Sequence, residues 1–503
     1  MPNQTAVTAP LLLAFVLGYF ALLLAVAWAT SRRSDNNSFF IGNRKSAWGL
    51  VAFGMVGTSL SGVTFISVPG AVGITSWHYL QIVLGQWLGY FVIAFVLLPL
   101  YYRLQLTSIY GYLAQRLGPR SYSTGASFFL LSRTLGATAR LYLVVKILQD
   151  SLLAGFGVPF WVTAAVILTM VLLYTFEGGV KTIVWTDTLQ TAGMLTGLAV
   201  CVGMLLSKMD LSPLQGLAAM QDQGLATIFN ADPFSRHFFA KQVLAGVFIT
   251  IVMTGLDQEM MQKSISVNTL RNSQKNIVVL SFVLLGVVTM FLFLGGLLHL
   301  FAAQVGLQAR GDLLFPGVVL GYLPVAVQVL FVIALISALF PSADGALTAL
   351  TSSFCIDILG MQQRQAWTEA RRQRIRKGVH LGFTALFMAL VMLFRWIDDP
   401  SMIGRILKIA AYTYGPLLGL FAFGLLTQRS VRDAWVPLVA VAAPALCWLI
   451  DANQAALFGR WQLGLELLVL NGLFTFVGLW AVSQPVSPQP RSPSPSPAVE
   501  GFQ

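Results

Sequence analysis

The sequence predicts an all-α polytopic membrane protein with about 13 transmembrane helices. Of its 503 residues, 56% are hydrophobic and only 10% are charged, whereas a soluble protein carries about 25% charged residues. Apolar runs of roughly 20 residues, the length at which a helix crosses a bilayer, recur along the chain. Lysine and arginine cluster between alternate runs, which is the charge pattern of a multi-pass protein.

The apolar runs, taken in order, define the predicted spans. The first run lacks a basic region and an A-x-A site and is long enough to span, so it is interpreted as a helix and not as a signal peptide. The tail, residues 485–503, is rich in proline and serine and is predicted to be a disordered cytoplasmic tail. The predicted spans are residues 10–30, 47–70, 77–102, 122–149, 157–176, 184–206, 239–260, 276–302, 325–357, 378–397, 402–428, 432–450 and 463–483.

The basic residues predict the orientation of the chain. They cluster after the first, third, seventh and ninth spans, and the loops opposite are poorer in lysine and arginine. The positive-inside rule makes the rich side cytoplasmic, so the N-terminus is expected outside and the C-terminus inside. The net charge of +12 therefore reflects topology, and no nucleic-acid partner is predicted. The clustered residues are Arg32, Arg33, Arg44, Lys45, Arg103, Arg116, Arg120, Lys263, Arg271, Lys275, Arg364, Arg371, Arg372, Arg374, Arg376 and Lys377.

The remaining residue types predict neither an enzyme nor a cofactor. Cys201, Cys355 and Cys447 all fall in apolar segments with no metal-binding spacing, and their odd number implies no disulfide framework. The four histidines are scattered. The sequence shows no metal-ligand cluster, nucleophile elbow or phosphate-cradling loop.

Polar residues at membrane depth indicate function, because an ionised side chain at mid-bilayer costs about 2.5–3.5 kcal/mol and usually faces a cavity or a partner. The first such stretch is ALISALFPSADGALTAL, residues 334–350. Pro341 frees a backbone carbonyl one turn earlier, Ser342 shares a face with Ala338, and Asp344 lies on an adjoining face. These oxygens suit a hard cation such as sodium. The alternative is a kinked helix whose Asp344 pairs with an arginine, and the two interpretations can coexist.

The second stretch, residues 48–73, interrupts an apolar run with six glycines, several hydroxyls and Pro69. This pattern is typical of a discontinuous helix, whose unwound carbonyls can bind an ion and whose hydroxyls can bind a solute. Close helix packing is the alternative role of the glycines.

Three charged residues are the remaining polar residues at membrane depth that indicate function. Asp187 follows a glycine turn and sits about one turn inside the next helix, where it is either functional or an interfacial charge that snorkels. Arg133 and Arg140 share one helix face, and Arg133 lies roughly 16 Å into its span. Its possible partners are a substrate anion, Asp187, Asp344 or backbone carbonyls.

Five stretches share their order and spacing with a known family. They are FFIGNRKSAWGL, LTSIYGYLAQRLG, YTFEGGVKTIVWTDTLQ, GLDQEMMQK, and residues 334–350 with the FCIDIL that follows. From about Phe39 to Gln428 the chain resembles the sodium:solute symporter family, which includes sugar, proline, sialic acid and iodide symporters.

The resemblance implies a leucine-transporter-like core of two inverted five-helix repeats. The implied organisation is an N-terminal transmembrane helix and cytoplasmic loop (1–46), a first repeat (47–206), an extracellular loop (207–238), a second inverted repeat (239–428), two C-terminal helices (429–484) and the tail (485–503).

The resemblance also implies sodium ligands. The sodium site shared across this fold would take the carbonyls of Gly57, Leu60 and Ala338 and the hydroxyl of Ser342. The family often has two adjacent serines there, and Pro341 replaces the first. Asp344 falls where some members carry a serine of a second sodium site, and Asp187 matches a family aspartate near that site. Asp344 is therefore predicted to be a coupling-ion residue.

The solute is implied to lie between two broken helices. The sugar symporters place an asparagine and a gating tyrosine where this chain has Thr250 and Met253, so a hexose is disfavoured. Hydroxyls beside a buried arginine favour a small carboxylate-bearing solute. The implied substrate-binding residues are Ser59, Ser61, Thr64, Gln81, Arg133, Thr250, Met253 and Thr254.

The predicted function is therefore sodium-coupled import of a small polar solute by alternating access, in the plasma or inner membrane. The expected partners are the solute, sodium and the lipid bilayer, and no cofactor is expected. A proton-coupled symporter of the same fold is the nearest alternative. A membrane sensor would need an output domain, and only about 20 residues follow the last predicted span.

Overall fold

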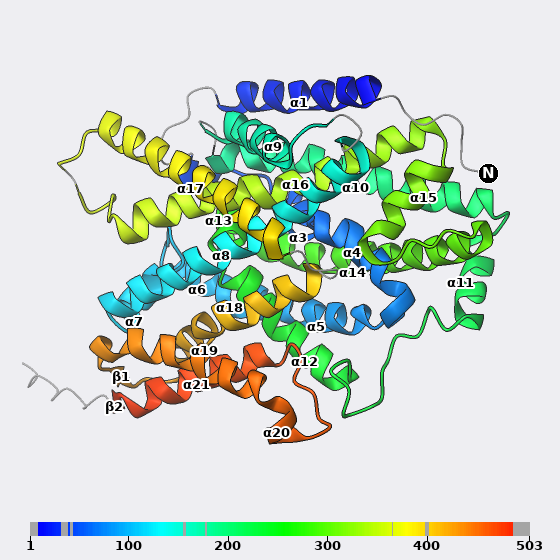
Figure 1. Cartoon of the computed structure of the whole chain (residues 1–503). Helices are drawn as coiled ribbons and strands as arrows, with labels where there is room; N and C mark the ends of the chain where they lie inside the picture. Colours follow the sequence, from blue (N-terminus) through cyan, green and yellow to red (C-terminus); the bar gives the residue numbers. More distant parts are fainter. Residues whose placement is uncertain are drawn as a thin grey trace, which may run out of the picture.

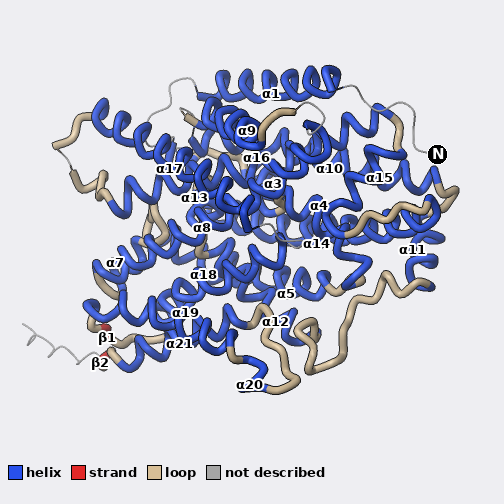
Figure 2. Tube along the Cα trace, viewed as in Figure 1, coloured by secondary structure: helices blue, strands red, loops and turns tan. Residues whose placement is uncertain are grey.

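The structure is a computed structural model that describes residues 9–31, 39–40, 44–153, 157–176, 179–364, 366–397 and 402–485. Within these ranges the chain is almost wholly helical (Figures 1 and 2). Loops connect the helices, and the strands in these ranges form one two-stranded antiparallel pair, β1 (Ser430–Val431) with β2 (Ser483–Gln484). The all-α prediction is confirmed, and the predicted disordered tail lies outside the described residues beyond Pro485.

Eight helices in the described ranges are long and apolar enough to cross a membrane. They are Tyr79–Arg103 (α5 Tyr79–Val92, η2 Ile93–Leu97 and α6 Leu98–Arg103), α8 (Pro119–Leu148), α10 (Gly179–Lys208), α14 (Leu270–Val305), Val325–Ile358 (α16 Val325–Ser353 and η7 Phe354–Ile358), α17 (Glu369–Ile397), Ile406–Leu426 within α18 (Met402–Leu426), and Asp433–Ala452 (η8 Asp433–Trp435 and α19 Val436–Ala452).

Two further spans are broken helices. The helices α3 (Trp48–Ser59) and α4 (Gly62–Thr75) meet at a bend of 55°, as the glycines and hydroxyls of this stretch predicted. The segment Phe239–Gly255, which comprises α12 (Phe239–Thr250) and η5 (Ile251–Gly255), bends by 65° into α13 (Gln258–Ile265). If each bent pair is one span, the described residues contain up to ten.

The other three predicted spans fall on shorter apolar helices. These are α1 (Ala9–Ser31), in which Ala14–Thr30 is the apolar part, α9 (Phe160–Thr175) and α21 (Leu467–Ala481). The helices α9 and α21, of 16 and 15 residues, are at 1.5 Å per residue shorter than the roughly 30 Å hydrocarbon core, whereas α1 has 23 residues. All thirteen predicted ranges coincide with helices or bent pairs among the described residues.

Several short elements were not predicted as separate helices. Each has 10 residues or fewer, which is too short to register as a span of roughly 20 residues. They are η3 (Gln149–Leu153), α7 (Gly111–Arg116), α11 (Pro213–Asp222), η6 (Gly311–Leu313), α15 (Leu314–Tyr322) and α20 (Gln454–Phe458).

The core lies around α16, which is buried over nearly its whole length between α10, α3 and α8. Glycines permit the closest helix approaches. A Cβ at Gly246 would lie 2.1 Å from the carbonyl oxygen of Ile82, and a Cβ at Gly85 would lie 2.0 Å from that of Val243, so α12 and α5 touch through their backbones.

Candidate functional site

The break between α3 and α4 exposes backbone to the protein interior. Leu60 leaves helical geometry with φ −95° and ψ 86°, and Ser61 is extended with φ −71° and ψ 169°. The Leu60 amide still donates to the Val56 carbonyl at 2.9 Å. Carbonyl groups at such a helix end lack intrahelical partners and can bind a cation.

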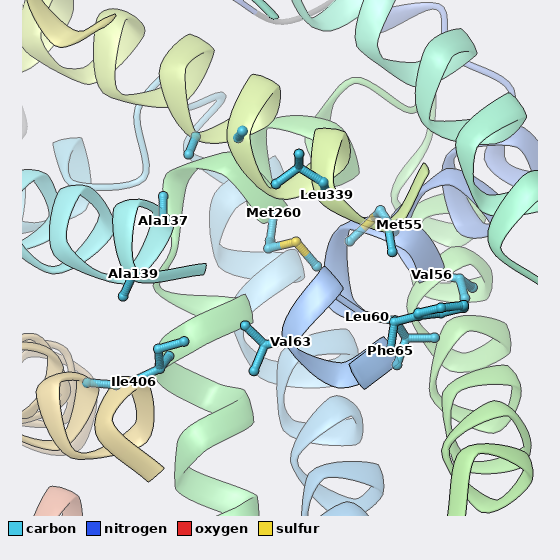
Figure 3. Close-up of a cluster of buried hydrophobic side chains, with 14 of the residues drawn as sticks. Met55, Val56, Leu60, Val63, Phe65, Ala137, Ala139, Met260, Leu339 and Ile406 are labelled. Carbon is cyan, nitrogen blue, oxygen red and sulfur yellow. The ribbon is translucent and has the colours of Figure 1, made fainter. Parts of the chain in front are cut away.

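The helix α16 lies directly against this break. A Cβ at Gly57 would lie 3.6 Å from Cγ of Pro341, and one at Gly62 would lie 3.8 Å from Cα of Leu339. Figure 3 shows the buried side chains that pack here, with Leu339 and Met260 close to the break. The predicted sodium ligands on α3 therefore face the segment of α16 that carries the others.

That segment stays helical across Pro341. The Ser342 hydroxyl donates to the Leu339 carbonyl at 2.9 Å, which leaves its oxygen free to accept or to ligate. Ala338 and Ser342 are both buried. The structure thus brings the four predicted ligands Gly57, Leu60, Ala338 and Ser342 onto two facing segments, and their binding of sodium stays a prediction.

Asp344 is fully buried one turn further along α16. Its Oδ2 accepts a hydrogen bond from the Tyr174 hydroxyl at 2.8 Å, and its Oδ1 accepts one from the Gly345 amide at 2.5 Å. Within the described part of the chain no lysine or arginine nitrogen lies within 4 Å of it. The alternative in which Asp344 pairs with an arginine is therefore wrong.

Asp187 is also fully buried, so the interpretation of it as a snorkelling interfacial charge is wrong. Its Oδ2 accepts hydrogen bonds from Lys263 Nζ at 2.7 Å and from the Thr58 hydroxyl at 3.1 Å. Its Oδ1 has no hydrogen-bond partner among the described residues, and the same holds for the hydroxyl of Thr348, one turn from Asp344. Buried oxygens left without a partner are suited to receive a cation.

Arg133 forms ion pairs with two carboxylates that were not predicted as its partners from the sequence. Its guanidinium forms an ion pair and hydrogen bond with Glu259, and its NH1 lies 3.8 Å from Oδ2 of Asp257. Asp257 also caps α13 and accepts a hydrogen bond from the Tyr414 hydroxyl at 2.8 Å. The pairing with Asp187 or Asp344 that the sequence suggested is not present in the structure.

A cavity of about 110 Å³ lies between the two broken helices. It is lined by seven of the eight predicted substrate-binding residues, and also by Arg140, Gln86, Tyr79 and Tyr90, which the sequence did not place there. The seven are Ser59, Ser61, Thr64, Arg133, Thr250, Met253 and Thr254.

The eighth residue, Gln81, lies outside the cavity lining. Its Nε2 donates to the carbonyls of His78 at 3.0 Å and His237 at 3.2 Å, and its Oε1 accepts from the Asn230 amide at 3.1 Å. Its amide group therefore anchors the segment before α12 to the start of α5. Gln86 lies five residues later on α5, and its side chain lines the cavity in place of Gln81.

Arg140 differs from Arg133 in its partners. Both line the cavity from α8, but Arg140 makes no ion pair or hydrogen bond among the described residues. It is half-buried, because part of its surface faces the cavity. Among the described residues, the site therefore combines one ion-paired guanidinium, Arg133, one guanidinium without an ion pair, Arg140, and several hydroxyl groups.

A second cavity, of about 870 Å³, shares Tyr79 and Leu407 with the first as lining residues. These two side chains thus form part of the partition between the cavities. His78 and His237 are among its lining residues, and their ring centroids lie 6.1 Å apart. Burial lowers the pKa of both histidines, and neighbouring Arg236 lowers that of His237 further.

The comparisons with known proteins agree with this arrangement. The family model described as "Sodium:solute symporter family" matches residues 39–433. The sodium/sialic acid symporter of Proteus mirabilis is 22% identical over 92% of this chain and 94% of its own length. The human sodium/iodide cotransporter is 26% identical over 81% of this chain and 65% of its own, and the mouse sodium-coupled monocarboxylate transporter 1 is 25% identical over 81% and 67%.

Solved structures show the same fold. A Na⁺-coupled sialic acid symporter in a substrate-bound outward-open state superposes with a TM-score of 0.80 at 18% identity, covering 93% of this chain and 96% of that chain. A nucleobase-cation-symport-1 family transporter in a closed conformation superposes with a TM-score of 0.53 at 15% identity, covering 87% and 92%. The chain is a multi-pass membrane protein with the leucine-transporter-like fold.

Proposed function

Since the chain belongs to the sodium:solute symporter family, we propose that it imports a small carboxylate-bearing solute together with sodium, and that Arg140 binds the solute carboxylate. The observation that carries this proposal is the contrast between two arginines. Arg133 already has Glu259 and Asp257 as counter-ions, whereas Arg140 faces the cavity with no carboxylate within 4 Å among the described residues.

The charge of Arg140 supports an anionic solute. An arginine without a counter-ion is costly at membrane depth. A carboxylate can accept two parallel hydrogen bonds from a guanidinium, which would satisfy both the charge and the donors. The hydroxyls of Ser59, Thr64 and Thr250 would serve the polar remainder of the solute.

The size of the cavity supports a small solute. Its volume of about 110 Å³ is below the roughly 300–1,000 Å³ of pockets for drug-sized ligands. A monocarboxylate of a few carbon atoms suits this volume better than a nine-carbon sugar acid. Among the relatives, the monocarboxylate transporter bears the name closest to this expectation.

The coupling ion would bind at the break of α3 and α4. The carbonyls of Gly57, Leu60 and Ala338 and the hydroxyl of Ser342 are the proposed sodium ligands. Asp344 and Asp187 would form a second cation site, supported by the buried Asp187 Oδ1 that has no partner. If protons replace sodium, Asp344 is the group expected to carry the proton, because no lysine or arginine nitrogen among the described residues lies within 4 Å of its carboxylate.

The two cavities suggest the route of the solute. We place the 870 Å³ cavity on the extracellular side, since the basic loops lie at the opposite end of the predicted topology. The solute would enter there, pass Tyr79 and Leu407, and reach Arg140. A sodium ion moving inward gains about 2.3 kcal/mol per 100 mV of membrane potential, which would drive the accumulation.

The test measures the thermal midpoint of the purified protein in sodium, potassium or choline chloride, with lactate, pyruvate, sialic acid, iodide or glucose added. A ligand that binds the native state raises the midpoint by mass action. We expect a sodium-specific rise with a monocarboxylate, which Arg140→Gln abolishes and Arg140→Lys partly retains.

Two results would contradict the proposal. A response to glucose that Arg140→Gln leaves intact would refute the carboxylate assignment. A solute response that follows pH and is equal in the three salts would indicate proton coupling.

A further inference from the structure

We propose that Lys263 competes with the coupling cation for Asp187, and that Glu259 sets the strength of this competition. The proposal rests on the proposed cation coupling. It assigns roles to two residues of the GLDQEMMQK stretch that the resemblance did not assign.

The Lys263 ammonium already binds one oxygen of Asp187, the carboxylate proposed to hold a second cation. Its ammonium lies 2.7 Å from Asp187 Oδ2, 2.7 Å from the Thr58 hydroxyl and 3.4 Å from Glu259 Oε1. Three oxygens around one monovalent positive charge resemble the ligand set of a cation site. All four side chains are at most 3% exposed, so water does not screen them.

A second cation at Asp187 would face this ammonium across one carboxylate. Like charges repel strongly where the surroundings exclude water. Sodium at the free Oδ1 and the ammonium at Oδ2 would therefore oppose each other. The structure offers Lys263 an alternative partner in Glu259, one turn away on the same helix, toward which it can move when a cation arrives.

Glu259 links this alternative to the solute cavity. One of its carboxylate oxygens pairs with Arg133, which lines the cavity, and the other pairs with Lys263. Its side chain packs on Gly345, where a Cβ would lie 2.6 Å from Glu259 Cδ. Asp344 is the preceding residue. Glu259 therefore lies between the solute cavity, Lys263 and the proposed second cation site.

This arrangement predicts opposite effects of two neutral substitutions. Lys263→Gln removes the competitor, so sodium should bind more tightly. Glu259→Gln removes the alternative partner of Lys263 and holds the ammonium on Asp187, so sodium should bind more weakly. A merely structural role would destabilise both variants without changing sodium affinity in opposite directions.

The experiment titrates the full-length detergent-purified protein with sodium chloride, balanced by choline chloride, and records the sodium concentration that gives the half-maximal rise in thermal midpoint. We expect this concentration to fall in Lys263→Gln and to rise in Glu259→Gln, each by roughly 5- to 150-fold, the usual range of coupling between two sites. Lys263→Arg keeps the charge and should remain near the wild type.

A matched control breaks an ion pair elsewhere. Lys408 Nζ lies 2.7 Å from Asp451 Oδ2 at the rim of the larger cavity, and Lys408→Gln should leave the sodium concentration unchanged. If the wild type responds to sodium but both variants shift in the same direction or not at all, the competition is refuted while sodium coupling stands. If neither the wild type nor Lys263→Gln responds, both proposals fail. If Lys263→Gln does not fold, the isosteric variant Glu259→Gln decides the question. An unchanged or lowered half-maximal sodium concentration in that variant refutes the competition.

Discussion

The pairing of Arg133 with two carboxylates makes a quantitative prediction for Arg133→Gln. The three side chains are at most 4% exposed, so removing the guanidinium leaves Glu259 and Asp257 buried with less positive charge beside them. Breaking a buried ion pair by removing one partner costs about 3–5 kcal/mol. Lys263 and Tyr414 still contact the two carboxylates, which places the expected loss at the lower end, about 3 kcal/mol.

A double-mutant cycle tests this reasoning. The free energy of unfolding is measured by chemical denaturation of Arg133→Gln, Glu259→Gln and the double variant in one detergent. We expect the double variant to be less destabilised than the sum of the single variants, because the second substitution removes the uncompensated charge. The matched control is Arg120→Gln, since the exposed Arg120 side chain forms no ion pair within the described ranges.

Additive losses of unfolding free energy in the two single variants would refute the coupling between Arg133 and Glu259. If Arg133→Gln destabilises no more than Arg120→Gln, or if the two losses add within about 0.5 kcal/mol, the guanidinium does not neutralise Glu259. Arg133 would then be available to a solute, and the assignment of the solute carboxylate to Arg140 would lose its basis.

Three further predictions concern other parts of the molecule. Gly246→Ala should lower the free energy of unfolding by about 1–3 kcal/mol, the usual cost of overpacking, because its new Cβ would meet the Ile82 carbonyl; an unchanged thermal midpoint would contradict the close backbone contact. Because burial lowers the pKa of His78 and His237 below the unfolded value, their contribution to stability should be complete above about pH 6.5 and fall as the pH drops through the folded values. Midpoints compared at pH 7.5 and 5.5 should therefore differ more in the wild type than in a double His→Asn variant. Pro341→Ser should lower the sodium concentration for half-maximal stabilisation by about tenfold or more. The new hydroxyl would add a polar contact to the ion, and a polar contact to a charged group contributes about 1.5–3 kcal/mol to binding. A higher sodium concentration would place sodium elsewhere.

The sequence predicted the helices well because a membrane span is a local property. A run of apolar residues identifies a span by itself, and the glycines and hydroxyls of residues 48–73 predicted a discontinuous helix, although not the position of its break at Leu60. The short helix α11 was not predicted. Its capping box, in which the side chains of Ser212 and Gln215 form reciprocal hydrogen bonds with the backbone, nevertheless has the S-x-x-Q sequence signature of a helix N-terminus.

The buried ion pairs were not predictable in the same way. Arg133 and Glu259 are 126 positions apart in the chain, and Asp187 and Lys263 are 76 apart. No periodicity relates such residues, and the fold alone brings α8, α10 and α13 together. The sequence suggested Asp187 and Asp344 as acidic partners of Arg133, whereas the acids beside Arg133 in the folded chain, Asp257 and Glu259, belong to the start of α13.

This difference decides which arginine the solute can use. From the sequence, Arg133 and Arg140 are equivalent, since both are positive, share one face of α8 and lack an acidic neighbour. Only the folded chain distinguishes them, by placing two carboxylates on the first and a hydroxyl-lined cavity beside the second. A buried positive charge indicates an anionic solute only after the protein's own anions have been assigned. Among the described residues of this chain, that assignment is the basis for proposing Arg140 as the partner of a solute carboxylate, and Glu259 as the residue through which solute binding and cation binding influence each other.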